Sequence, residues 1–360
     1  MNLTDFTFQS IRFLLLPIAF IYWMAIWVRN KLYDINVLKS TRFNLPLICV
    51  GNLSVGGTGK STMVEYLLGL LSRDFNTATL SRGYKRKTRG YILANENTGP
   101  LEIGDEPHLF HLKFPNVPVA VGEERLVAIP QLLQDRPETR VIVLDDAFQH
   151  RAVEAGLNIL LTDYSNLFTR DFYLPTGDLR DLKSRSKRAS IIMVTKCPSN
   201  LQEEERKSIK EEIRPLPDQH LFFSCIEYGK PYHLLHHNEI SFSRELEVLL
   251  VTGIANPKPL KNLLTNTVGF YDTLSFSDHH IFTIDDLREI KNRFKRIDST
   301  SKIILTTEKD AVRLIKFREE LMNIPIFVIP IRQKILFGEE PVFNGLIINF
   351  VRNFNRKNKE

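Results

Sequence analysis

Glycines, a lysine and a serine lie together between an apolar run at residues 47–50 and a run at 62–71 with apolar residues at helical spacing. A glycine-rich backbone can turn several N–H groups around a polyphosphate at the positive end of the next helix. The lysine would neutralise the β and γ phosphates, and the serine hydroxyl would ligate Mg²⁺. The alternative is a turn that binds no ligand. We predict an ATP site made by Ser54, Val55, Gly56, Gly57, Thr58, Gly59, Lys60 and Ser61.

This stretch departs at one position from the usual phosphate-loop pattern G-x-x-x-x-G-K-[ST]. Ser54 stands where the pattern has its first glycine. The nucleotide-binding class still follows from the strand before the loop and the helix after it. Ser54 alone does not assign a subclass.

Carboxylates stand at two further predicted junctions. The apolar run at 141–144 ends in Asp145 and Asp146, as expected for Mg²⁺ ligands beside a nucleotide. Adjacent carboxylates at a strand end are costly unless a cation or hydrogen-bond donors neutralise them, although both could also be solvated loop residues. Asp105, shortly before Pro107, is expected either as a helix N-cap or as a functional carboxylate.

A late Asp-His pair, Asp278 and His279, could accept the proton of a hydroxyl as it is phosphorylated. With His280 it could also bind a metal ion, but no third ligand is visible nearby at metal spacing. Guanine-specific recognition is not supported, because Pro198 follows Thr195-Lys196-Cys197 where an aspartate would have to read the base. The pair therefore favours a kinase that acts on a hydroxyl.

Alternation of apolar strand runs and helical runs predicts an α/β fold. We expect a doubly wound, mainly parallel sheet of the P-loop NTPase type, a second and smaller α/β subdomain, and an N-terminal apolar helix. The expected units are residues 1–33 (a membrane-associated helix), 34–217 (the kinase core), 218–245 (a linker or β-ribbon) and 246–360 (a subdomain that completes the active site).

Composition limits the classes of protein to which the chain can belong. The chain has 360 residues, 43% of them hydrophobic, which suffices for a sizeable core. A net charge of +6 would suit nucleic acid or an anionic membrane, so charge alone does not choose. The 3 cysteines are far apart, which argues against a disulfide framework or a zinc site.

The N-terminal residues 13–28 form an uninterrupted apolar run with basic flanks and both tryptophans of the chain. As a helix this run would be about 24 Å long, shorter than a hydrocarbon core of about 30 Å. A signal peptide and a buried core helix are the alternatives. The aromatic residues and the basic flanks favour a membrane-embedded or interfacial anchor.

Several motifs occur together in an order that resembles the tetraacyldisaccharide 4'-kinase family of lipid A synthesis. They span almost the whole chain, and Ser54 in place of glycine is the variant that this family has. The motifs are residues 52–61, Ser81-Arg82-Gly83-Tyr84, Gly104-Asp105-Glu106-Pro107, Asp145-Asp146 with Gln149-His150, residues 174–180, Asp278-His279 and Thr307-Glu308-Lys309-Asp310.

The resemblance implies transfer of the ATP γ-phosphate to the 4'-hydroxyl of a tetraacylated disaccharide 1-phosphate, with Mg²⁺, at the cytoplasmic face of the bacterial inner membrane. It implies that Lys60, Asp105 and His279 take part in catalysis, and that Ser61, Asp145 and Asp146 hold Mg²⁺. The residues implied to contact the substrate are Arg82, Tyr84, Gln149, His150, Arg180 and Asp181.

Departures from the family pattern at Lys85, Asp178 and Asp181 concern the lipid headgroup site. The main alternative function is a membrane-associated P-loop switch ATPase that controls a partner protein. A nucleic-acid kinase has only the net charge in its favour. We expect the lipid substrate and the membrane surface as partners, no nucleic acid, and no obligate protein partner.

Overall fold

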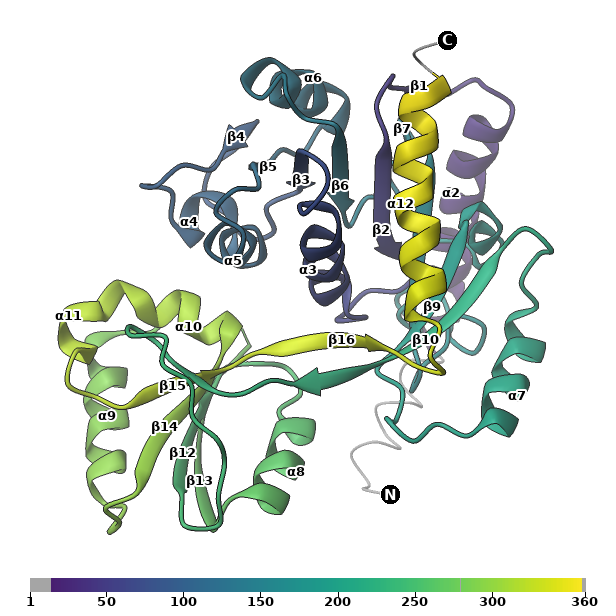
Figure 1. Cartoon of the computed structure of the whole chain (residues 1–360). Helices are drawn as coiled ribbons and strands as arrows, with labels where there is room; N and C mark the ends of the chain where they lie inside the picture. Colours follow the sequence, from purple (N-terminus) through teal and green to yellow (C-terminus); the bar gives the residue numbers. More distant parts are fainter. Residues whose placement is uncertain (1–13, 279, 358–360) are drawn as a thin grey trace.

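The computed structural model describes residues 14–278 and 280–357 and consists of two lobes (Figure 1). The first lobe is built on a 9-stranded sheet in the order β16-β10-β9-β8-β2-β6-β3-β5-β4. Its strands are β2 (Leu47–Asn52), β3 (Thr77–Ser81), β4 (Ile92–Leu93), β5 (Val119–Val121), β6 (Val141–Asp145), β8 (Leu157–Asp163), β9 (Ile191–Thr195), β10 (His220–Tyr228) and β16 (Ile331–Ile335).

The central strands of this sheet are parallel, and the antiparallel pairs β4–β5 and β10–β16 lie at its ends. Interior strands such as β2 and β6 begin with four apolar, buried residues because helices cover both faces of the sheet. The helices of this lobe are α3 (Lys60–Leu71), α4 (Pro100–Ile103), α5 (Asp105–Lys113), α6 (Arg125–Asp135), η1 (Lys183–Arg188), α7 (Glu203–Ile213) and α12 (Glu340–Lys357).

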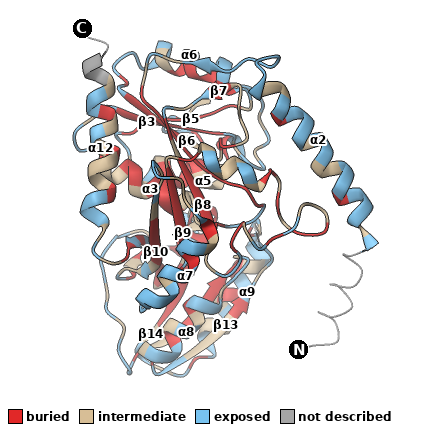
Figure 2. Ribbon diagram, turned by 90° about the vertical axis from the view of Figure 1, so that its right-hand side faces the viewer, coloured by how far each residue is buried: buried red, intermediate tan, exposed pale blue. Residues whose placement is uncertain are grey.

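Alternate residues of β2 enter two separate apolar clusters. Leu47 and Cys49 pack with α6 and α7, whereas Ile48 and Val50 pack with α3, α5 and α12. Figure 2 shows the strands of this sheet as the buried centre of the lobe. This confirms a mixed α/β fold with mostly parallel strands.

The second lobe has a 5-stranded sheet in the order β11-β15-β14-β12-β13. Its strands are β11 (Tyr232–His233), β12 (Glu247–Thr252), β13 (Phe270–Ser275), β14 (Lys302–Thr307) and β15 (Ile326–Ile329). Its helices are α8 (Lys258–Thr267), α9 (Ile284–Lys295), α10 (Glu308–Leu314), η2 (Ile315–Phe317) and α11 (Arg318–Leu321).

A two-stranded ribbon of β10 and β16 joins the lobes (Figure 1). Because β16 brings the chain back, α12 packs on the first lobe, where Phe343, Ile347 and Val351 are buried with residues of α3. The C-terminal segment therefore differs from the expected unit 246–360, since its last part belongs to the first sheet. The spacing of residues along the chain does not indicate the surface on which this terminal helix docks.

Helix α2 (Leu16–Asp34) lies along the outside of the first lobe, with mostly exposed side chains (Figure 2). Only Ala19 and Asn30 of this helix are buried. In the part of the chain that the structure describes, no helix has both the length and the apolarity needed to cross a membrane. The next strand in the chain, β1 (Thr41–Arg42), pairs in parallel with β7 (Val153–Glu154) in a short two-stranded sheet.

Candidate active site

The loop between β2 and α3 has the backbone that its glycines predict. Gly56 and Gly59 have φ angles of 93° and 83°, in the left-handed region that side chains disfavour. No atom lies within 4 Å of the point where a Cβ of Gly56 or Gly57 would stand, so both positions face open space. Gly59 is the N-cap of α3 and makes no side-chain cap, so the first-turn N–H groups of this helix are available to an anion.

Neighbouring strands hold this loop by hydrogen bonds. The Asn52 side chain donates to the Thr58 hydroxyl at 2.8 Å, and the Thr195 hydroxyl at the end of β9 donates to the Thr58 carbonyl at 2.9 Å. The Val55 N–H donates to the Asp178 carbonyl at 2.7 Å. Ser54 is buried, and its backbone forms an isolated β-bridge with Leu179 that joins the loop to the segment after β8.

Lys60 and Ser61 occupy the first turn of α3, both partly exposed. The ammonium of Lys60 lies 3.9 Å from Asp146. Burial lowers the pKa of Lys60, and the charge of Asp146 opposes this shift. The lysine therefore lies beside the carboxylates, at the edge of the sheet where β2 and β6 end.

Asp145 and Asp146 differ in electrostatic state although they are adjacent. Burial raises the pKa of Asp145 to about 6, and the charges of Asp146 and Glu106 add to this shift. Burial would also raise the pKa of Asp146, but a hydrogen bond from Arg180 and the charge of Lys60 outweigh it and hold that pKa below its usual value. Ser81 donates a hydrogen bond to Asp145 at 3.1 Å.

These side chains suit Mg²⁺. Carboxylate and hydroxyl oxygens are the ligands that this cation prefers, and Asp145, Asp146 and Ser61 offer them at one edge of the sheet. The raised pKa of Asp145 reflects in part repulsion between carboxylates that a divalent cation would relieve. Among the described residues, no set of three or more His, Cys, Asp and Glu side chains is grouped to hold a metal.

Arg125 contacts the backbone of the Asp145-Asp146 pair and was not among the site residues predicted from the sequence. It is 1% exposed, donates to the Gly122 carbonyl, and donates to the Asp145 carbonyl at 3.1 Å. Burial lowers its pKa to about 10, so it stays charged at neutral pH. An arginine directly after a turn carries no sequence signal that distinguishes it from a surface residue.

Arg180 and Gln149, two of the predicted substrate residues, converge on Asn52. Arg180 donates to the Asn52 side chain at 2.5 Å and to both carboxylate oxygens of Asp146, while the Gln149 amide donates to the Asn52 carbonyl at 2.6 Å. The guanidinium is thus brought to the site but is paired with a carboxylate there.

The Asp181 N–H donates to the Leu53 carbonyl after β2 at 3.3 Å, but its side chain is bonded to α2. It is 2% exposed and accepts a hydrogen bond from Asn30 of α2 at 2.9 Å. Tyr22 donates to the Arg180 carbonyl at 3.3 Å, and Arg29 donates to the Gln149 carbonyl at 3.1 Å. Asp181 was predicted to contact substrate, whereas in this structure it joins α2 to the loop that carries Arg180.

Arg82 and Tyr84 lie in the loop after β3, and both are exposed. That loop packs against Gly104, where a Cβ would come within 2.9 Å of the Tyr84 carbonyl. Burial, together with the charges of Arg125 and Arg82, lowers the pKa of His150 to about 4. His150 is therefore neutral at physiological pH and offers a substrate hydrogen bonds but no charge.

Asp105 is the first residue of α5, and Gly104 with a φ of 92° is the N-cap. The expected N-cap role of Asp105 is therefore wrong, because the glycine supplies the positive φ that this entry into the helix requires. Arg313 of α10 donates to Asp105 at 2.6 Å. His279 lies outside the described residues; Asp278 beside it acts electrostatically on Lys309, which pairs with Glu106.

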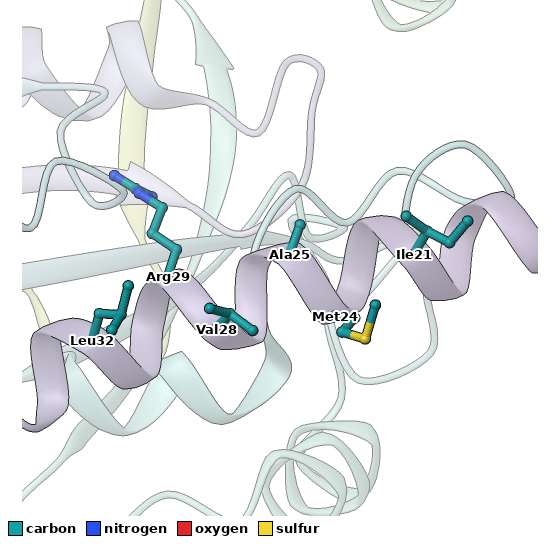
Figure 3. Close-up of a pocket in the computed structure, with 6 residues that line it drawn as sticks. All are labelled: Ile21, Met24, Ala25, Val28, Arg29 and Leu32. Carbon is teal, nitrogen blue, oxygen red and sulfur yellow. The ribbon is translucent and has the colours of Figure 1, made fainter.

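A groove runs along the outer side of α2 (Figure 3). Its lining is apolar except for Arg29. The lining residues are Ile21, Met24, Ala25, Val28, Arg29 and Leu32. The groove lies on the helix whose inner side is bonded to the Arg180 loop. Most of its lining residues are exposed, and Arg29 also donates to the Gln149 carbonyl, so the groove borders the segment that carries Gln149.

Comparison with known proteins gives consistent matches over nearly the whole chain. A family profile described as tetraacyldisaccharide-1-P 4'-kinase matches residues 11–352. The "Tetraacyldisaccharide 4'-kinase" of Bacteroides thetaiotaomicron is 44% identical, with 98% of this chain and 96% of that protein covered. The protein of the same name from Flavobacterium johnsoniae is 42% identical, with 95% of this chain and 98% of that protein covered.

A solved structure shares the fold. The crystal structure of LpxK from Aquifex aeolicus in complex with ATP superimposes with a TM-score of 0.74 at 29% identity, covering 95% of this chain and 99% of that one. The sequence matches and the structural match thus each cover both lobes of the chain. The chain belongs to the tetraacyldisaccharide 4'-kinase family.

Proposed function

We propose that this protein transfers the γ-phosphate of ATP to the 4'-hydroxyl of tetraacyldisaccharide 1-phosphate in lipid A biosynthesis. The observation that carries the proposal is the meeting of Lys60, Ser61 and the Asp145-Asp146 pair at one sheet edge in a chain of this family. Phosphoryl transfer needs little covalent chemistry from the protein. Positioning and charge stabilisation therefore account for most of the catalysis.

The nucleotide binds over the loop of residues 54–61. Backbone N–H groups of the loop and the first turn of α3 hold the phosphates, and Lys60 stabilises the negative charge that moves in the transition state. Ser61, Asp145 and Asp146 would hold Mg²⁺, which would neutralise the charge of the phosphate oxygens. The hydrogen bonds from Thr195 and Asn52 keep the loop open before ATP arrives.

The acceptor hydroxyl approaches from the side of Asp105. This carboxylate, together with His279, accepts the hydroxyl proton as the bond to phosphorus forms. The location of Asp105 at the first turn of α5, where Arg313 donates a hydrogen bond to it, supports an oriented carboxylate. Arg82, Tyr84, Gln149, His150 and Arg180 contact the sugar and its phosphate, and Asp181 acts through the position of the Arg180 loop.

The lipid acceptor implies contact with a membrane. We propose that α2 lies against the cytoplasmic face of the bacterial inner membrane, with the groove of Figure 3 toward the lipid. Ile18, Phe20 and Ile21 are 54%, 61% and 60% exposed, an unusual concentration of large apolar side chains. The hydrogen bonds from Tyr22, Arg29 and Asn30 then bring the headgroup residues near the lipid surface.

The activity is tested with the full chain in detergent, labelled ATP and tetraacyldisaccharide 1-phosphate. A bisphosphorylated lipid is expected, and a deacylated disaccharide should be a far poorer acceptor. Phosphorylation of soluble sugars alone would reject the lipid substrate. ATP hydrolysis that responds to no acceptor would favour a switch ATPase instead.

The membrane proposal is tested by flotation with vesicles of phosphatidylethanolamine and phosphatidylglycerol. Replacing Ile21, Met24 and Val28 by serine should move most of the protein out of the vesicle fraction. A matched control replaces Met322 and Val342, both 56% exposed and away from α2, by serine. Equal flotation of the two variants would show that α2 is not the membrane contact.

A further inference from the structure

Helix α10 of the second lobe contacts α5 of the first lobe (Figure 1). Three acid–base pairs cross this contact, and each has one residue on either helix. Arg313 pairs with Asp105 at 2.6 Å, Lys309 with Glu106 at 2.9 Å, and Glu308 with Lys113 at 2.7 Å. The first two pairs involve the start of α5, where the candidate proton acceptor is located.

The second lobe fixes Arg313 before it reaches Asp105. The Arg313 side chain is 6% exposed and also donates to Asp310 at 3.3 Å. Asp310, which is fully buried, accepts from the Gly253 N–H at 3.0 Å and from the Thr307 hydroxyl at 2.7 Å. The guanidinium is thereby held at the ends of β12 and β14. Its position therefore depends on the position of the second lobe.

The loop that carries Asp278 is packed into the same junction. A Cβ on Gly253 would come within 2.9 Å of the Ser277 carbonyl and 3.2 Å of the Asp310 carboxylate. Burial lowers the pKa of Lys309, but Glu106 and then Asp278 outweigh this effect and raise it, so Lys309 stays charged between the two lobes. The carboxylates of both lobes therefore meet around cations that α10 supplies.

The third pair extends the contact to the nucleotide helix. Lys113 lies 2.5 Å from Glu65 of α3 and 2.7 Å from Glu308. The other oxygen of Glu308 accepts from the N–H of Ile331, the first residue of β16, at 3.2 Å. Lys113 and the buried Glu308 together link α5, α3 and the ribbon between the lobes.

We propose that α10 is the element by which the second lobe completes the active site, and that Arg313 is a positioning residue that holds the Asp105 carboxylate toward the acceptor. This inference rests on the proposed function for the role of Asp105. Lys309 and Glu308 hold α5 against α10, so that the orientation of Asp105 depends on how the lobes meet. Exposed ion pairs contribute little, but these side chains are mostly buried, and removal of one partner leaves the other charge poorly solvated.

The test compares Arg313→Gln and Arg313→Lys with the wild-type full chain. Arg313→Gln should lower kcat on the lipid acceptor at least about tenfold, since small misplacements of a reacting group are costly, and leave the KM for ATP within about twofold. Arg313→Lys keeps the charge and should recover part of kcat. Hydrogen exchange of the amides in α5 should become faster in Arg313→Gln, which is a readout independent of turnover.

Arg293→Gln is the matched control. Arg293 makes a two-pronged pair with Asp272 at 2.6 and 3.0 Å inside the second lobe, away from α5. It should change neither kcat nor the exchange of α5. If Arg313→Gln does not fold, Lys309→Gln tests the same contact and should give a smaller loss of kcat with the same faster exchange.

The outcomes separate this inference from the proposed function. A wild-type protein without lipid kinase activity would reject the function, while the exchange of α5 would still measure the contact of the lobes. Wild-type kcat and exchange in Arg313→Gln would overturn the inference. So would an equal loss of kcat and ATP affinity with no recovery in Arg313→Lys, because that pattern indicates a general loss of structure.

Discussion

The two sides of the active site are built in different ways. The nucleotide side lies within the first lobe, where the loop after β2 and the carboxylates after β6 end neighbouring parallel strands. The acceptor side is shared, because Asp105 on α5 faces Arg313, which is 208 residues away in the chain and belongs to the second lobe. We infer that the first side is preorganised by its sheet, whereas the second depends on the contact between the lobes. Substitutions on the two sides should therefore affect ATP affinity and turnover differently.

Substitution of Lys60 should have the largest effect and affect both ATP affinity and turnover. Lys60→Ala removes the cation beside Asp146 and should lower kcat/KM about 10³-fold, with weaker ATP binding measured by calorimetry. Lys334→Ala, which removes an exposed lysine paired with Glu227 at 2.9 Å, is the control and should behave as wild type. Normal ATP binding in Lys60→Ala would contradict the assignment of this loop to the phosphates.

Substitution of Asp105 should separate turnover from ATP affinity. Asp105→Asn keeps the size of the side chain but cannot accept the proton, so kcat should fall about 10²-fold while the Kd for ATP stays within about twofold. Asp285→Asn, at an 86% exposed side chain in α9, serves as the control. A parallel loss of ATP affinity would place Asp105 on the nucleotide side and break the distinction drawn here.

Arg180 stands between the two sides, since it pairs with Asp146 and with Asn52 and is predicted to contact the lipid phosphate. Arg180→Lys keeps one charge but loses the forked geometry, so kcat/KM for the lipid should fall about tenfold, with a smaller change for ATP. Arg170→Lys is a matched control, because Arg170 makes a similar two-pronged pair with Glu212 on the surface. Equal effects on both substrates would indicate that Arg180 acts only through Asp146.

The nucleotide side was readable from sequence because its residues are contiguous or end apolar runs. Glycines with positive φ, a lysine and serine at a helix start, and Asp145 after four apolar residues each have a local signal. The α/β class followed from the same alternation of strands and helices. The assignment of roles to these residues remains a prediction.

The supporting residues were not readable because their partners lie far away in the chain. Asn30 reaches Asp181 at a separation of 151 residues, and Arg313 reaches Asp105 at 208. Arginine and asparagine are usually surface residues, and spacing along the chain does not show which of them become buried. The return of α12 to the first lobe was missed for the same reason.

The smallest predicted effect concerns the loss of stability caused by burying Glu65 at the contact between the lobes. Burial raises the pKa of Glu65 to about 7, with Lys113 opposing and Glu308 adding to the shift. Between the ordinary glutamate pKa of 4.5 and this raised pKa, the unfolded chain has released a proton that the folded chain keeps, so stability falls as the pH rises through that window. Glu65→Gln cannot ionise and escapes this loss. The Tm of Glu65→Gln minus that of wild type should therefore be about 2 °C larger at pH 8 than at pH 5, measured by calorimetry.

Glu245→Gln, at an exposed position, is the control and should show no such difference between the two pH values. If the Tm difference between Glu65→Gln and wild type is the same at both pH values, Glu65 is ionised in the folded protein at no cost in stability. The buried acid–base cluster between α3, α5 and α10 then stabilises the contact between the lobes more than its burial suggests.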